Sequence, residues 1–149
     1  FNHALGTSAM SFFCAPSLAR QLQGPFPQCL HRAPMLIQGP TSSVRQQLDH
    51  WFNKYQLQPL IVGEFDDCAL MTTFGSARMG AFPIPSVVEK DYTGSGAFKV
   101  LGRTNQVRAT YYAISVERRL THPCVVAITK SAQRFSKETP HSDGTAETF

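Results

Sequence analysis

Short apolar runs alternate with longer mixed segments along most of the chain. Three runs of strand length, each followed by Pro, Gly or Asp, are Met10–Ala15, Ala33–Gln38 and Leu60–Phe65. A fourth, Gly80–Pro85, is shorter, and its prolines suit a strand end or edge. Continuous apolar strands joined by amphipathic helices are typical of a parallel α/β sheet covered on both faces. We therefore expect an α/β fold.

The clearest helix signal lies between the second and third of these runs, in the string TSSVRQQLDHWFNKYQ. Its apolar residues recur at helical spacing and form one stripe: Val44, Leu48, Trp51, Phe52 and Tyr55. Thr41, Ser42 and Ser43 offer hydroxyl caps, and Ser43 with Gln46 has the spacing of a capping box. The stripe assigns Trp51 to the core.

A second helix is expected directly after Leu60–Phe65, with Asp66 as its cap. Its buried side chains would be Leu70, Met71 and Phe74. Residues 16–32 are rich in Pro, Gly and Gln and predict a loop with one helical turn.

The remaining pattern predicts two strands, a helix and a tail. The strands are Phe98–Gly102 and Arg108–Val116, which follow a turn at residues 93–96. The helix begins at Pro123 and would bury Val125, Ile128 and Phe135. Residues 136–149 are polar, have no apolar period, and are expected to form a disordered tail.

The bulk composition narrows the class of protein. The chain has 149 residues, is 42% hydrophobic, and carries a formal net charge of +4. Its Lys and Arg residues are spread out, whereas a nucleic-acid surface gathers them, so we do not expect direct DNA or RNA binding by this segment. No apolar run approaches the ~20 residues of a membrane helix. The four cysteines form no CxxC pair, which indicates reduced thiols in a cytoplasmic protein.

Two polar segments follow apolar strands and are the candidate binding edges. In an open α/β sheet, ligands bind outside the carboxyl ends of the strands, where helices begin. At residues 39–43, the hydroxyls either cap the helix or bind an anion or a polar molecule. At residues 64–67, Asp66 and Asp67 either start a helix or join Glu64 as ligands of a hard cation. An acid/base pair is disfavoured, because no nucleophile or His lies nearby.

No other group gives a catalytic pattern. Cys14 ends a strand, but the His residues are scattered and no motif supplies a base for a thiolate. Residues 39–43 lack the Lys and the glycine spacing of a P-loop. The sequence therefore predicts neither an enzyme nor a cofactor.

Two long strings resemble the effector-binding domain of LysR-type transcriptional regulators: APMLIQGPTSSVRQQLDHWFNKYQLQPLIVGEFDDCALMTTFGSARMGAFPIPSVV and VRATYYAISVERRLTHPCVVAI. Within them LDHWFN, GEFDDCALM and YYAISVERRLTHP carry the resemblance. It covers about residues 5–130 and is nearest a branch of activators associated with sodium/proton antiporters. It implies a type 2 periplasmic-binding-protein-like fold of two α/β lobes with an effector cleft between them.

The resemblance also implies domain boundaries and a truncated chain. Residues 1–18 would be the end of the first lobe and the crossover, and residues 19–112 a nearly complete second effector-binding lobe. Residues 113–135 would return to the first lobe as a strand and a helix, before the tail. The helix-turn-helix DNA-binding domain of the family would be absent from this chain.

By the same resemblance, the cleft-facing positions would fall on Cys14, Thr41, Ser42, Phe65, Asp66, Phe82 and Pro83. Arg78, Met79 and Gly80 stand where many relatives have Gly-Leu-Gly, which would alter the backbone near the floor of the cleft.

These observations predict an effector-sensing fragment of a bacterial transcription regulator. A small molecule or a monovalent cation such as sodium would bind in the cleft and shift the state of a DNA-bound homo-oligomer, a dimer or a tetramer. DNA would be contacted only through the helix-turn-helix domain, and no membrane would be involved. The alternatives are a solute-binding protein, or an enzyme such as a transferase that uses Thr41–Ser43, on the same two-lobe scaffold.

Overall fold

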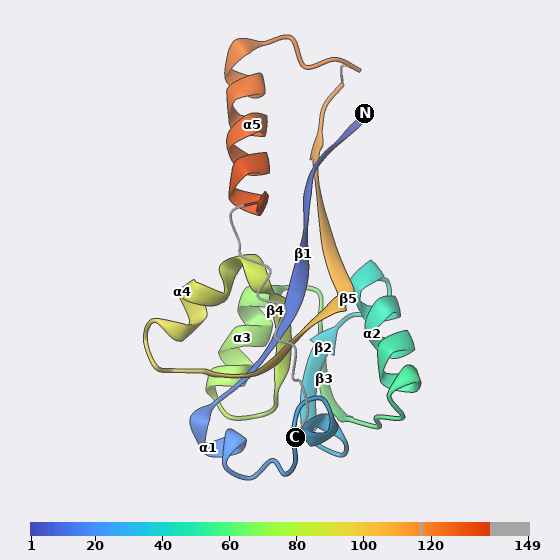
Figure 1. Ribbon diagram of the computed structural model, residues 1–149, viewed down its shortest axis with the longest axis vertical. Coiled ribbons are helices and arrows are strands. Elements are labelled where there is room, and N and C mark those ends of the chain that lie inside the picture. Colours follow the sequence, from blue (N-terminus) through green and yellow to red (C-terminus); the bar gives the residue numbers. More distant parts are fainter. Residues whose placement is uncertain (117, 138–149) are drawn as a thin grey trace, which may run out of the picture. The chain divides into compact units, whose positions relative to one another are not determined.

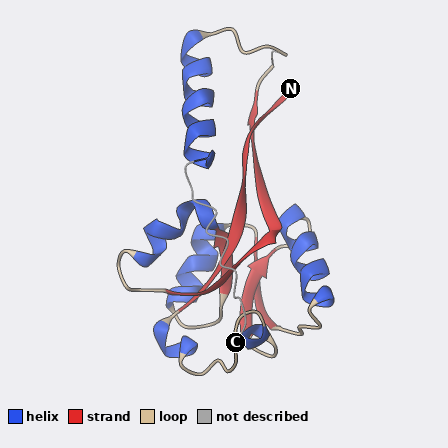
Figure 2. Cartoon of the chain, in the orientation of Figure 1, coloured by secondary structure: helices blue, strands red, loops and turns tan. Residues whose placement is uncertain are grey.

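The computed structural model describes residues 1–116 and 118–137, and the chain divides into two compact units. One unit is Ser8–Ala109, and the other combines Phe1–Thr7 with the chain from Thr110 onward. Helices and strands alternate along the chain, as expected for an α/β protein (Figures 1 and 2). Among the described residues, no helix is long and apolar enough to cross a bilayer.

Two small sheets form the framework of the Ser8–Ala109 unit. In one, β2 (Pro34–Gln38) and β3 (Leu60–Phe65) pair in parallel. The other has the order β4-β1-β5, with β1 at Asn2–Cys14, β4 at Phe82–Pro85 and β5 at Lys99–Ile114. Because β1 and β4 are antiparallel, the expectation of a purely parallel sheet is wrong.

Strands β1 and β5 are longer than the sequence pattern predicts. Strand β1 extends the predicted run at Met10–Ala15 back to Asn2. Strand β5 is continuous from Lys99 to Ile114, where the pattern predicts two strands with a polar break. In the sheet, β5 lies next to β1, and backbone pairing with a neighbouring strand overrides the low strand preference of polar residues.

Strand β3 is less covered than its apolar sequence predicts. Leu60, Ile61 and Val62 have exposed fractions of 60%, 37% and 40%. β3 has only one neighbour in its sheet, β2, so it is an edge strand. The expectation of burial on both faces therefore does not hold for β3.

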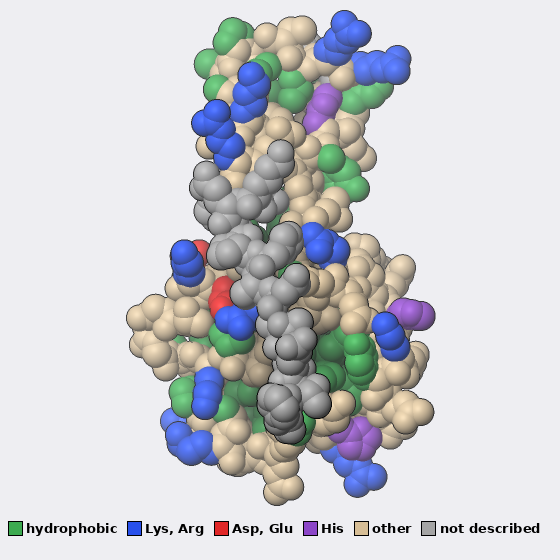
Figure 3. Space-filling view, viewed as in Figure 1, with side chains coloured by type: hydrophobic (Ala, Val, Ile, Leu, Met, Phe, Trp, Pro, Cys, Tyr) green, Lys and Arg blue, Asp and Glu red, His purple; other side chains and the backbone are tan. Residues whose placement is uncertain are grey.

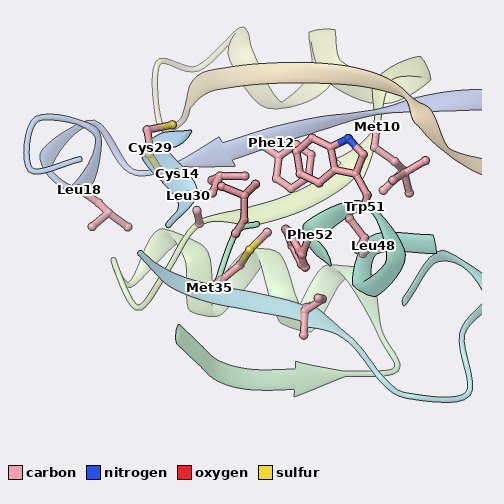
Figure 4. Packing of buried hydrophobic residues seen from close by; sticks show 14 of the residues in the cluster. Met10, Phe12, Cys14, Leu18, Cys29, Leu30, Met35, Leu48, Trp51 and Phe52 are labelled. Carbon is pink, nitrogen blue, oxygen red and sulfur yellow. The ribbon is translucent and has the colours of Figure 1, made fainter. Parts of the chain in front are cut away.

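Helix α2 (Ser43–Lys54) packs against the larger core cluster. The residues buried or partly buried there are those of the predicted stripe: Val44, Leu48, Trp51, Phe52 and Tyr55. Figure 4 shows the Trp51 ring beside Phe12 of β1, with centroids 5.4 Å apart and an interplanar angle of 22°. The Phe26 ring, from the connecting loop, lies 5.8 Å from Trp51. Stacked aromatic rings contribute attraction beyond the apolar area that they bury.

The connection between β1 and β2 is largely irregular, as predicted. It contains α1 (Pro16–Ala19) and a 3₁₀ turn at Gln28–Leu30. Leu18 and Leu30 are buried in the larger cluster, so the loop closes one end of the core.

Helix α3 (Cys68–Ser76) covers a second core cluster, which consists of Phe13, Leu36, Met71, Phe82 and Ile84. Met71 is buried as predicted, whereas Leu70 and Phe74 have exposed fractions of 51% and 36%. At Gly75, an added Cβ would lie 2.3 Å from the Phe82 ring, so a residue without a side chain lets that ring approach the helix.

The end of α3 holds a left-handed residue that is not glycine. Arg78 has φ of +68°, and its N–H donates to the Gly75 carbonyl at 3.0 Å. The Met79 N–H reaches back to the Phe74 carbonyl at 3.3 Å, which completes a Schellman motif. Arg78 thus occupies a backbone conformation that glycine adopts without strain.

Two short helical segments after β4 have no signal in the apolar pattern. They are a 3₁₀ turn at Ser86–Val88 and α4 at Glu89–Thr93. Glu89 accepts hydrogen bonds from the buried Ser11 hydroxyl, at 2.6 Å, and from Arg103 Nε, at 2.8 Å. These side-chain bonds, together with the packing of Val88 and Tyr92 against the second core cluster, hold the segment on the β1 sheet.

The second unit contains helix α5 (Pro123–Lys137), which begins at the predicted proline. Gln133 Nε2 donates to the Ala4 carbonyl at 3.0 Å, so the helix contacts the start of β1 within this unit. Val125 and Ile128 have exposed fractions of 40% and 69%, which corrects their predicted burial.

The side chain of Phe135 and residues 138–149 lie outside the described part of the chain. The predicted burial of Phe135 and the predicted tail at residues 138–149 therefore remain predictions. Residues 136 and 137 belong to α5 and not to the predicted tail.

Replacing Arg78 with glycine should stabilise the protein by about 1 kcal/mol, because a left-handed conformation costs a residue with a Cβ roughly 1–2 kcal/mol and glycine almost nothing. The midpoint of urea unfolding should rise for Arg78→Gly. Arg78→Ala is the control, since it removes the charge and keeps the Cβ. Equal midpoints for the two variants would contradict the backbone explanation.

Candidate functional site

The carboxyl ends of β2 and β3 lie side by side. Gln38 is the register partner of Phe65, and the Gly39 N–H donates to the Phe65 carbonyl at 2.9 Å. Helices α2 and α3 begin shortly after these strand ends. Each helix start presents first-turn N–H groups and the positive end of a helix dipole. The two predicted binding edges, residues 39–43 and 64–67, therefore form one surface, which together with Gln38 is called here the strand-end site.

The predicted cap of α3 is wrong by one position. The Ser42 hydroxyl accepts from the Val44 N–H at 3.2 Å and caps α2. Asp67, not Asp66, caps α3 by accepting from the Leu70 N–H at 2.7 Å. Helix boundaries are uncertain by one or two residues in any sequence pattern, so spacing alone could not choose between neighbouring aspartates.

Thr41 and Asp66 are exposed at the strand-end site without serving as caps. The Asp66 carboxylate lies against the backbone of Gly39, because an added Cβ there would be 2.3 Å from Asp66 Oδ1. Ser43 is the first residue of α2 and not its cap, which corrects the proposed capping box.

The acidic residues of this edge have separate roles. Glu64 forms an ion pair with Arg45 at 2.5 Å, and Arg45 also pairs with Asp49 at 3.1 Å. Asp67 caps α3, so Asp66 is the one of the three candidate cation ligands that neither caps a helix nor forms an ion pair with Arg45. Across the described residues, no group of three or more His, Cys, Asp or Glu side chains could hold a metal ion.

Three of the residues carried over from the family resemblance are buried: Cys14, Phe82 and Pro83. Phe82 is fully buried, and its ring stacks on Phe13 with centroids 5.9 Å apart. Cys14 is also fully buried (Figure 4). Burial, together with the nearby Cys29, raises the pKa of Cys14 to about 11, so its thiol stays protonated at neutral pH. None of these three side chains offers a surface to a ligand.

Gln38 is a polar residue of this site that the sequence analysis missed. Its Nε2 donates to the Pro83 carbonyl at 3.2 Å, which fixes the orientation of the amide. Its Oε1 is buried and has no hydrogen-bond partner. The sequence does contain a signal for this residue, since Gln38 is the one polar side chain of the apolar run Ala33–Gln38 and stands at its end. A buried acceptor without a donor lowers the stability of the folded protein by about 1–3 kcal/mol, so a ligand donor that bonded to Gln38 Oε1 would recover this energy.

The surface charge is spread out. On the face in Figure 3, the described Lys and Arg side chains are scattered singly and in small groups and form no continuous basic patch. This face therefore provides no gathered positive surface for a nucleic acid.

Comparison with known proteins defines the family. The model of the LysR substrate binding domain matches residues 2–135. The chain therefore belongs to the LysR substrate-binding-domain family. It is similar to the transcriptional activator protein NhaR of Escherichia coli strain K12, with 35% identity over 128 residues. That match covers 86% of this chain but only 42% of NhaR.

Solved structures share the fold. The effector domain of the regulator AmpR of Pseudomonas aeruginosa superimposes with a TM-score of 0.68 at 16% identity, covering 91% of this chain and 65% of the AmpR domain chain. The effector-binding domain of QuiR, in complex with shikimate, gives a TM-score of 0.63 at 18% identity, covering 92% of this chain and 65% of the QuiR domain chain. These matches confirm the α/β, type 2 periplasmic-binding-protein-like fold.

Ser42→Ala should destabilise the protein by about 1 kcal/mol, the usual cost of losing a helix N-cap. Ser43→Ala should change the stability little, because Ser43 lies inside the first turn of α2. Urea unfolding of both variants checks the assignment. A larger loss for Ser43→Ala than for Ser42→Ala would contradict it.

The four cysteines should divide into two reactivity classes. Cys68 and Cys124 are exposed and should react with a thiol reagent at mildly alkaline pH, whereas the buried Cys14 and Cys29 should react only after denaturation. Counting labelled sites by mass spectrometry, with and without urea, measures this. Rapid labelling of Cys14 in the native protein would show that its burial is wrong.

Proposed function

We propose that this domain binds a small polar effector or ion at the strand-end site and transmits binding to a DNA-bound homo-oligomer. The family match over residues 2–135 is the observation that carries the proposal. The geometry supports the location, because two helix starts and the ends of two parallel strands converge there, as in other α/β ligand sites.

The groups at the strand-end site suit a ligand with both donors and acceptors. The helix N-termini and the Thr41 hydroxyl offer hydrogen-bond donors. The Asp66 carboxylate and the unpaired Oε1 of Gln38 offer hydrogen-bond acceptors. Because Gln38 Oε1 is covered, a ligand donor would reach it only after a small movement of its neighbours. Phe65, which is half-buried, would supply an apolar wall.

Sodium is the first effector to test. The resemblance to activators associated with sodium/proton antiporters motivates it, and Asp66 is the exposed carboxylate near the strand ends. Asp66 alone is a weak ligand set, so sodium binding would recruit further oxygens, such as backbone carbonyls and water.

Coupling to transcription follows from differential affinity. An effector that binds one arrangement of the protein better than another shifts the population toward that arrangement. In this proposal DNA is contacted through a helix-turn-helix domain outside this sequence, the oligomer is a dimer or a tetramer, and the protein acts in the cytoplasm. The naming of NhaR as a transcriptional activator supports regulation over an enzymatic role.

Calorimetry of the intact regulator should show a saturable response to sodium that equimolar potassium does not reproduce. Asp66→Asn should weaken the response about tenfold, a typical cost for removing a charged partner. Asp91→Asn, at an exposed position on α4, should leave it unchanged.

Equal and null responses to both cations would remove sodium as the effector. A response that Asp66→Asn leaves intact would place the cation elsewhere and contradict the proposed location.

A further inference from the structure

A groove lies on the Ser8–Ala109 unit, between helix α2 and strand β5, and shares only Ser43 with the strand-end site. It has a volume of about 660 Å³. Six of its lining residues lie along α2 and the seventh on β5: Ser43, Gln46, Gln47, His50, Trp51, Lys54 and Gln106. Nothing in the proposed function uses this groove.

Trp51, which lines the groove, carries a buried donor without a partner. Trp51 is only 3% exposed, and its indole N–H has no acceptor. In Figure 4 the indole nitrogen points away from α2, toward β1, the strand that carries Phe12 and Met10. A buried N–H without an acceptor costs about 1–3 kcal/mol, and an acceptor supplied by a ligand would recover that cost.

The rim of the groove is positive. Lys54 Nζ donates to Gln106 Oε1 at 2.6 Å, which is a neutral partner, and none of the seven lining residues is acidic. Lys54 forms no ion pair with any described carboxylate. His50, one turn before Lys54, is exposed on the same side of the helix. An anion would meet a positive charge and several donors here.

The hydrogen bonds at the rim of the groove can rearrange when a ligand binds. The indole N–H is covered in this structure, so a ligand atom reaches it only if a neighbour moves. Gln106 is exposed, and its amide is held by Lys54 and by the Tyr55 hydroxyl, each at 2.6 Å. An anion that accepted a hydrogen bond from Lys54 in place of Gln106 Oε1 would break the Lys54–Gln106 bond.

We propose that this groove is a second ligand site, which binds a small organic carboxylate through Lys54, His50 and the Trp51 N–H. Trp51 is the one tryptophan of the chain, so its fluorescence reports on the groove directly. The groove and the strand-end site share only Ser43, which neither proposal assigns to a ligand, so either proposal can fail without the other.

The test is a fluorescence titration of the whole chain with succinate, and with succinamide at matched ionic strength as the neutral probe. Succinate should change the Trp51 emission saturably, and succinamide should not. Lys54→Gln should weaken the apparent affinity about tenfold, as expected for loss of a charged hydrogen bond. Lys90→Gln, at an exposed position on α4, is the matched control, and Asp66→Asn should leave the titration unchanged.

A two-dimensional amide spectrum of each variant shows whether the fold persists, and the indole N–H resonance should shift with succinate in the same titration. A linear or absent response to succinate would overturn the proposal. So would an equal response to succinamide, or an affinity unchanged in a folded Lys54→Gln variant.

Discussion

The parallel pairing of β2 with β3 is the constraint on which the candidate site depends. The hydrogen bond from the Gly39 N–H to the Phe65 carbonyl makes both strands end at the same level. Whatever follows each strand must therefore meet at one edge. A side chain at Gly39 would strike Asp66, so glycine at this position allows the two ends to close together. The convergence of two helix starts is a consequence of strand register, not of local sequence.

The polar residues at this edge divide into structural and available groups. Ser42 and Asp67 satisfy helix N-termini, and Glu64 neutralises Arg45. These roles explain much of the acidic and hydroxyl content that first suggests a binding site. What remains for a ligand is a smaller set, centred on Asp66, together with Thr41 and the buried acceptor of Gln38. Counting every polar residue of this edge as a ligand group would therefore overestimate the charge available to a ligand.

The core rests on aromatic packing around the one tryptophan. Trp51 contacts rings from β1, the following loop and its own helix, with centroid distances from 5.3 to 5.8 Å. This packing immobilises α2 on the sheet, and with it the cap at the strand-end site. The same packing fixes the buried indole N–H on the side of the ring that faces the strands. One aromatic residue thus links the fold to the groove between α2 and β5.

The sequence by itself determined the α/β class, the buried stripe of α2, the strands Ala33–Gln38 and Leu60–Phe65, and the family. These features depend on local periodicity and on long matching strings, both of which can be read along the chain. Only the tertiary structure decided that β1 and β4 are antiparallel, that β5 is one strand, and that Phe82 is a core residue. It also assigned the α3 cap to Asp67 and left Gln38 Oε1 without a donor. These outcomes depend on which segments meet in space, and contacts between residues far apart in the chain leave no periodic signal in the sequence.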